Sequence, residues 1–82
     1  MEKRIGTITV FVTDRSVTPH INETLSQYAE LIAARQGLPF RDRSVAVISL
    51  IVEGDMDEIN QLSGKLGRIG GVEVKTVVSK AK

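Results

Sequence analysis

The chain has 82 residues, of which 41% are hydrophobic and 26% charged, and its formal net charge is +1. This size and composition predict one globular domain over residues 1–82 with an ordered core at about 4–79, and exclude a long disordered protein. The lack of cysteine excludes disulfides and thiol catalysis. No apolar run reaches the roughly 20 residues of a membrane span. The charged start does not resemble a signal peptide, so we expect a cytoplasmic protein.

The first predicted element is a strand. Residues 4–13 are rich in β-branched side chains that alternate between two faces. Ile8, Val10 and Val12 share one face, whereas Phe11 shares the other with threonines. Both faces therefore look less polar than contact with water requires.

A turn at residues 14–16 leads into a predicted amphipathic helix. Ser16 or Thr18 is expected to cap its start, and Pro19 fits the first turn. The apolar positions recur at three- and four-residue spacing and form one stripe: Val17, Ile21, Leu25, Tyr28 and Ile32. The stretch 31–35 is ambiguous, since it could extend the helix or form an edge strand.

The segment 37–43 is predicted to be a turn or loop, because Gly37, Pro39 and three charged residues interrupt the apolar pattern. The strand at 45–52 follows and is apolar on both faces. Alternation places one set on each face: Ala46, Ile48, Leu50 and Val52 against Val45, Val47 and Ile51. A chain this short has no spare element to cover the second face, so we expect a partner to cover it.

A second amphipathic helix is predicted from Asp55, which forms a capping pair with Glu58, to the glycines at 67–71. A last strand at 72–78 and a frayed tail at 79–82 complete the chain. The minimal order is βαβαβ. If residues 31–36 form a strand, the order becomes βαββαβ, an α+β ferredoxin-like two-layer sandwich with two helices on one face of an antiparallel sheet, and we favour this version.

The residues offer little for catalysis or for metal binding. The one histidine, His20, lies in the first turn of the predicted helix without a nucleophile beside it. The four carboxylates at 53–58 lack the spacing of an EF-hand and are explained by helix capping. We therefore predict no enzyme, no metal and no cofactor.

Residues 35–43 combine Phe40 with three arginines, which suit carboxylate or phosphate contacts. The structural alternative is that Phe40 packs across a subunit interface with Leu38, and that the arginines pair with Asp42 or with a neighbouring chain.

Two blocks, residues 35–52 and residues 57–75, resemble the small proteins known as iron-only hydrogenase system regulators, and the resemblance extends over residues 4–80. It implies a ferredoxin-like ACT-type domain, similar to the ligand-sensing half of nickel-responsive regulators, and a strand at 31–35. Those regulators bind nickel through a histidine-rich strand. This chain has only His20, so nickel sensing is not implied.

The resemblance implies a non-enzymatic regulatory module that forms a homo-oligomer, a dimer or a tetramer, and binds a small anionic ligand such as an amino acid at a subunit interface. ACT-type ligands lie near the first strand-to-helix turn, where exposed helix amides favour an anion. The expected ligand residues are Asp14, Arg15 and Ser16, joined by Arg35, Phe40, Arg41 and Arg43 of a neighbour. The expected oligomer interface is Phe11, Val45, Val47 and Ile51.

Two alternatives remain. The chain could be a ligand-free scaffold for protein–protein interaction. It could also bind nucleic acid through four basic residues: Arg41, Arg43, Arg68 and Lys75. These residues do not form the dense basic stripe that DNA binding requires. We therefore do not expect direct DNA binding, and a role in transcription would act through a protein partner.

Overall fold

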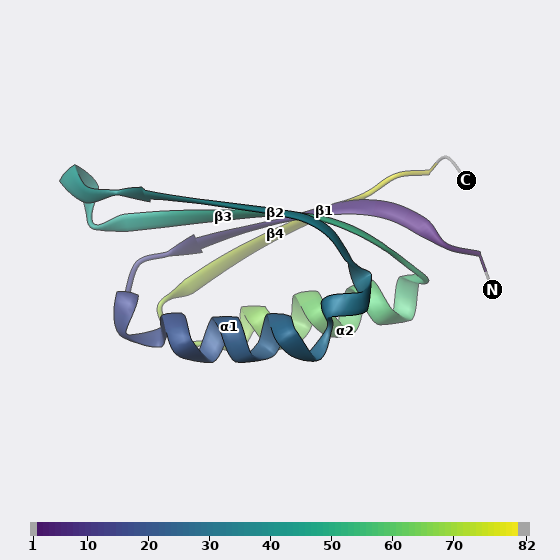
Figure 1. Ribbon diagram of the computed structural model, residues 1–82, viewed down its shortest axis with the longest axis horizontal. Coiled ribbons are helices and arrows are strands. Elements are labelled where there is room, and N and C mark those ends of the chain that lie inside the picture. Colours follow the sequence, from purple (N-terminus) through teal and green to yellow (C-terminus); the bar gives the residue numbers. More distant parts are fainter. Residues whose placement is uncertain (1, 81–82) are drawn as a thin grey trace.

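The computed structural model describes residues 2–80. The elements follow in the order β1 (Arg4–Val12), η1 (Arg15–Val17), α1 (Thr18–Gln27), η2 (Ala29–Leu31), β2 (Ile32–Phe40), η3 (Arg41–Arg43), β3 (Val45–Gly54), α2 (Met56–Gly67) and β4 (Val72–Val78), where η marks a short 3-10 helix. The strands form one antiparallel sheet in the order β2-β3-β1-β4. Both helices lie on the same face of it (Figure 1). The predicted βαββαβ sandwich is confirmed.

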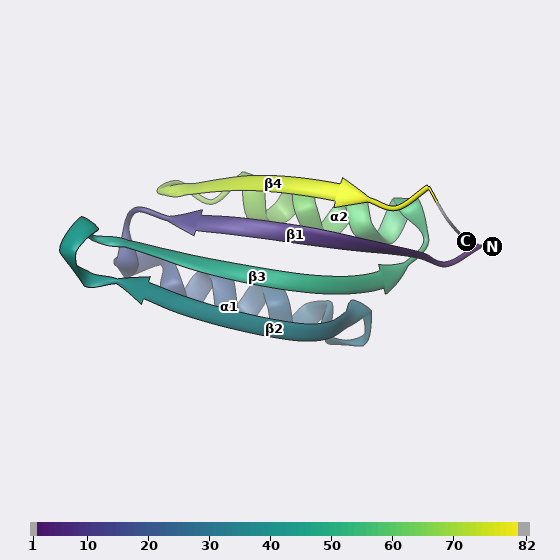
Figure 2. The same cartoon turned by 90° about the horizontal axis from the view of Figure 1, so that it is seen from above.

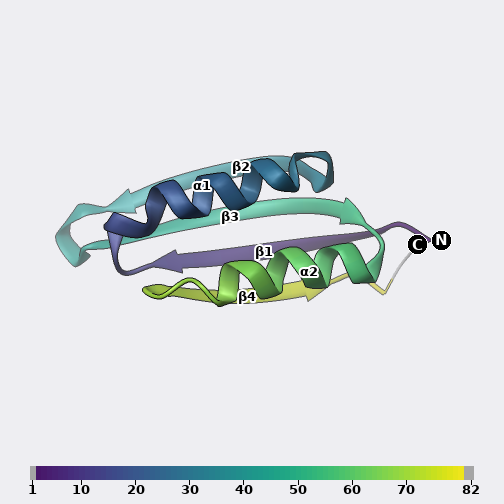
Figure 3. The same ribbon diagram turned by 90° about the horizontal axis from the view of Figure 1, so that it is seen from below.

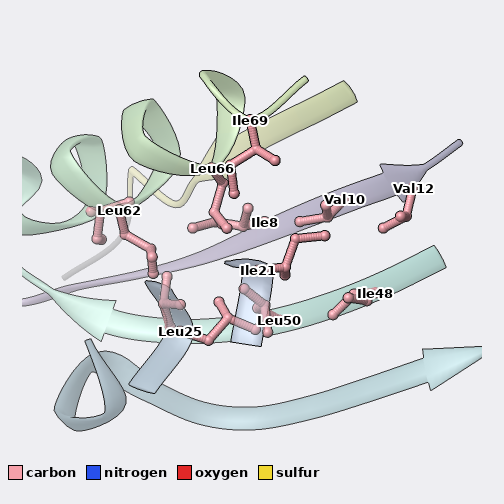
Figure 4. Close-up of a cluster of buried hydrophobic side chains, with 12 residues drawn as sticks. Ile8, Val10, Val12, Ile21, Leu25, Ile48, Leu50, Leu62, Leu66 and Ile69 are labelled. Atoms are coloured by element: carbon pink, nitrogen blue, oxygen red, sulfur yellow. The ribbon is translucent and has the colours of Figure 1, made fainter. Parts of the chain in front are cut away.

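The core lies between the sheet and the two helices. Side chains from the central strands β1 and β3 meet the apolar stripes of α1 and α2 (Figure 4). Seen from the helix side, α1 lies over β2 and β3, and α2 lies over β1 and β4 (Figure 3). The side chains that are almost completely buried are Ile8, Val10, Val12, Ile21, Leu50, Val52, Ile59, Leu62 and Leu66.

The alternation along β3 determines which of its faces meets the helices. Ile48, Leu50 and Val52 are buried in the core, so Val47 and Ile51 lie on the opposite face. We call this second side of the sheet the open face, because both helices lie behind it in Figure 2. The sequence left the choice between the two faces undecided, and the placement of the helices decides it.

The prediction of a loop at 37–40 was wrong, because β2 continues through these residues to Phe40. Pro39 lacks an amide hydrogen, but β2 is an edge strand, where a missing donor is tolerated. The strand pairing supports this assignment, with Leu38 opposite Val47 and Pro39 opposite Ala46. The turn itself is η3, which ends at Ser44 in the left-handed conformation, with φ of 54°.

The two helices begin differently. The predicted capping pair of α2 is confirmed: the Glu58 amide donates to Asp55 Oδ1 at 2.8 Å, and the Asp55 amide donates to Glu58 Oε1 at 3.1 Å. The predicted cap of α1 was wrong, because its N-cap is Val17, which makes no side-chain hydrogen bond. The Ser16 hydroxyl instead donates a hydrogen bond to Asp14, the N-cap of η1.

The ends of the chain are only partly described. Within residues 2–80, the Ser79 amide donates a hydrogen bond of 2.8 Å to the Ile5 carbonyl, so the predicted tail is tied to β1 at this residue. The rest of that prediction, at 81–82, lies outside the described residues, as does residue 1.

Gly71 joins the end of the α2–β4 connection to the end of β1. Its carbonyl accepts hydrogen bonds from the Thr13 amide at 2.8 Å and from the Thr13 hydroxyl at 3.1 Å. Its φ of +81° is favourable only for glycine, and an added Cβ would lie 2.6 Å from Asp14 Cβ. The close approach of these two turns therefore requires glycine at this position.

Gly71→Ala is expected to lower the free energy of unfolding by about 1–2 kcal/mol from the left-handed backbone alone, with a further loss from the contact with Asp14. Urea unfolding followed by circular dichroism measures this loss. Gly70→Ala is the matched control, because its added Cβ meets nothing within 4 Å and its φ is not positive. Equal stabilities of the two variants would contradict the assignment.

Candidate functional site

A hollow of about 500 Å³ lies at one end of the sheet, lined by Thr13, Asp14, Arg15, Arg41 and Ser44. We call it the arginine hollow. The strand register explains its position: Val12 at the end of β1 pairs with Ala46 near the start of β3, so the segments that continue from these strands lie close together. One of these segments leads from β1 to α1, and the other is the β2–β3 turn.

Asp14 is held in place by its own turn. Its Oδ1 accepts hydrogen bonds from the Ser16 hydroxyl at 2.7 Å and from the Ser16 amide at 3.0 Å. The hydrogen bond from the Ser16 hydroxyl lowers the pKa of the Asp14 carboxyl below its ordinary value, and the bond from the Ser16 amide lowers this pKa further. Asp14 therefore stays ionised at neutral pH. The amide of Ser16, one of the residues expected to bind an anionic ligand, already donates to this carboxylate.

The two arginines of the hollow come from different turns, Arg15 from η1 and Arg41 from η3. Within residues 2–80, no hydrogen bond or ion pair engages either guanidinium. Arginine presents a planar set of donors that matches a carboxylate or a phosphate. Two guanidinium groups beside one carboxylate can hold a small molecule that carries both an anionic and a cationic group.

The other predicted ligand residues lie elsewhere. Arg35 Nη2 donates a hydrogen bond of 2.6 Å to Asn22 Oδ1, which ties β2 to α1. Phe40 and Arg43 line a separate hollow of about 550 Å³ on the open face. Arg41 of the same chain lines the arginine hollow with Asp14, whereas Arg35 and Arg43 do not. A contribution of this loop from a neighbouring chain stays a prediction.

The residues predicted as the oligomer interface share the open face. Phe11, Val45 and Val47 line the hollow there together with Phe40 and Arg43. Large apolar side chains on this face expose about half of their surface or more: Ile5 56%, Leu38 54%, Phe40 43%, Ile51 45% and Val77 67%. Several large apolar side chains exposed on one face are typical of an interaction site.

Sequence reasoning missed Thr13 and Ser44 as lining residues of the arginine hollow. It also missed a groove along the helices, where Lys65 Nζ lies 5.2 Å from the centre of the Tyr28 ring. Periodicity within one segment could not predict this contact, because Tyr28 directly follows α1 whereas Lys65 belongs to α2.

The structure adds two observations on metals and membranes. Across residues 2–80, nowhere do three His, Cys, Asp or Glu side chains gather as a metal-binding group, and His20 is exposed on α1. Neither helix in this part of the chain has the length and apolar character needed to cross a membrane.

The family model of the TM1266-like proteins, described provisionally as iron-only hydrogenase system regulators, matches residues 4–76. The chain belongs to this family. The resemblance that the two sequence blocks indicated is thus confirmed over nearly the whole domain. The comparison with curated proteins yielded no match.

Solved structures agree with this assignment. The family member resembles the uncharacterised protein TM1266 from Thermotoga maritima, with 42% identity, a TM-score of 0.91, and coverage of 96% of this chain and 100% of that one. It also shares its fold with the C-terminal domain of MgtC from Mycobacterium tuberculosis, at 12% identity and a TM-score of 0.71, covering 95% of this chain and 89% of that domain.

Ser16→Ala is expected to raise the pKa of the Asp14 carboxyl, because it removes the hydroxyl that lowers this pKa most. In the unchanged protein, the stabilisation from this interaction is fully present above the unfolded Asp pKa of about 3.9 and is lost as the pH falls through the lower folded value. An NMR titration of the Asp14 carboxyl measures the change. Ser26→Ala, which removes a hydroxyl that donates to the Glu23 carbonyl, is the control. An unchanged Asp14 titration in Ser16→Ala would contradict this account.

Proposed function

We propose that this member of the TM1266-like family is a non-enzymatic regulatory module that acts as a homo-oligomer and binds a small zwitterion, such as an amino acid, in the arginine hollow. The observation that carries the proposal is the grouping of Asp14, Arg15 and Arg41 around one cavity. The guanidinium groups of Arg15 and Arg41 would bind the ligand carboxylate, and the Asp14 carboxylate would bind its ammonium group.

A binding role is supported over catalysis by the character of these groups. A general acid or base works best when its pKa lies near the operating pH. The pKa of Asp14 is lowered, and arginine keeps its proton at any physiological pH. These side chains are suited to holding charges in place rather than to moving protons.

Oligomer formation is supported by the apolar side chains of the open face. Ile51 and Val77 are largely exposed in the isolated chain, and covering such side chains is favourable by roughly 25 cal/mol per Å² of apolar surface. The same face also supports the alternative of a ligand-free scaffold. In that alternative, no ligand binds in the arginine hollow.

Nucleic-acid binding is less well supported. Arg68 belongs to the groove along the helices, whereas Arg43 lines the hollow on the open face. The basic residues of that hypothesis therefore do not share one surface, and a single DNA backbone would not contact them together.

Ligand binding is tested by a thermal-shift screen with the twenty amino acids and inorganic phosphate. At least one amino acid is expected to raise the melting temperature, and Arg41→Ala is expected to weaken its binding at least about tenfold, because a charge-assisted hydrogen bond is lost. Titration calorimetry measures the affinity. Arg68→Ala is the control, since it removes the same charge from outside the hollow. A screen without any shift would favour the scaffold, whereas equal binding by both variants would place the ligand outside the arginine hollow.

Oligomer formation is tested by light scattering at micromolar concentration. The unchanged protein is expected to be a dimer or a tetramer, and Val47→Asp to shift it toward the monomer, because the charge would be buried in the interface. Ala29→Asp places the same charge on an exposed residue of η2, outside the open face, and is expected to change nothing. A monomeric unchanged protein would refute this part of the proposal.

A further inference from the structure

The open face has an ordered pattern along its strands. The register places side chains in rows that cross the sheet, and the middle row is polar: Gln36, Ser49, Thr9 and Lys75. On one side of it lies the row of Leu38, Val47, Phe11 and Glu73, in which only Glu73, on the edge strand β4, is charged. On the other side lies the row of Ala34, Ile51, Thr7 and Val77. The pattern is therefore nearly the same when read from either end of β3.

The two ends of β3 carry opposite charges on this face. Arg43 lies beside Phe40 and Val45 at the β2–β3 turn. Glu53 lies at the other end of β3, opposite Ile5 of β1, on the face that Ile51 also occupies. Arg43 and Glu53 are ten positions apart in a segment that is mostly strand, a distance of about 30 Å. Figure 2 shows β3 running along the whole length of the sheet.

Two identical sheets can pack through this face around a twofold axis in two ways. If the axis runs along the strands, like ends coincide and Arg43 faces the partner's Arg43. If the axis runs across the strands, opposite ends coincide and Arg43 faces the partner's Glu53. Both ways place the apolar side chains of β3 against those of the partner's β3, so the burial of apolar surface does not choose between them.

We propose that a second copy of this chain covers the open face in the antiparallel orientation, with β3 over the partner's β3 and Ser49 near the twofold axis. Val47 then packs on the partner's Ile51, and Val45 lies over the partner's Glu53. The side chain of Arg43, which lines the same hollow as Val45, pairs with that carboxylate. The charges at the two ends select this orientation, since the alternative brings like charges together at both ends. The inference rests on the proposed oligomer and adds its geometry.

The size of the face fits such a dimer. The molecule measures 41 × 20 × 17 Å along its principal axes, and the open face spans the longest and the shortest of these, as Figures 1 and 2 show. This footprint is of the order of the roughly 800 Å² that each partner contributes to a stable interface. Face-to-face sheets pack about 10 Å apart, which leaves room for one layer of side chains from each copy.

Lys75 is the charged residue of the middle row, and in this orientation it faces the partner's Lys75. It lies on β4, at the edge of the sheet, where its long stem can keep the ammonium group in water. A like-charge contact at such an exposed rim costs little compared with burial of the apolar rows.

Charge reversal tests the orientation. Arg43→Glu and Glu53→Arg are each expected to raise the dimer dissociation constant about tenfold at low salt, because each change replaces two attractive pairs with two repulsive ones. The double variant R43E/E53R restores both pairs and is expected to dimerise within about threefold of the unchanged protein. Analytical ultracentrifugation measures the constants, and added salt should reduce the differences. Arg68→Glu, which makes the same charge change on α2, is the control.

The outcomes separate this inference from the proposed function. Weakened single variants with a restored double variant support the antiparallel dimer. Single variants that dimerise like the unchanged protein overturn the orientation while the oligomer stands, since like charges at each end would remain like charges. A double variant as weak as the single ones also overturns the pairing of Arg43 with Glu53. A monomeric unchanged protein overturns the oligomer itself, before any variant is compared.

Discussion

The two central strands, β1 and β3, carry apolar side chains on both faces of a sheet that has helices on only one. Val10 and Leu50 are fully buried beneath the helices, and their chain neighbours Phe11 and Ile51 lie on the open face. Side chains alternate between the two faces of a strand. A shift of one residue would therefore turn the buried side chains to the open face and the open-face side chains toward the helices. The helix-covered core therefore fixes the position of every apolar residue on the open face, through which we propose that the protein associates.

The same register creates the arginine hollow. The antiparallel pairing brings the end of β1 beside the start of β3. The turn that follows β1 and the turn that precedes β3 therefore meet at one end of the sheet. The η3 turn contributes Arg41 to this hollow and Arg43 to the hollow on the open face. These two arginines are only two positions apart in the sequence, yet they line two different hollows. A ligand and a second copy would therefore contact the same short turn.

The contrast between α2 and α1 shows how far local sequence signals reach. The start of α2 was predictable because Asp55 and Glu58 satisfy each other's backbone amides within one turn. The start of α1 was not, since Ser16 turns back to Asp14 and the chain first forms a 3-10 turn. The segment around Pro39 was misread for a related reason. Proline usually marks a turn, but an edge strand accepts it, and only the order of strands shows that β2 is at an edge.

The sequence by itself determined the two amphipathic helices and the presence of two apolar strand faces, because each depends on periodicity or on residues close together in the chain. It left the order βαβαβ open beside βαββαβ, and the resemblance to the family favoured the four-stranded order. Only the tertiary structure decided which face the helices cover, where β2 ends, and that Asp14, Arg15 and Arg41 share one hollow while Arg35 and Arg43 do not. These features depend on strand order, on register and on turn conformations such as the left-handed Ser44. They join residues distant in the chain, and no local pattern records such contacts.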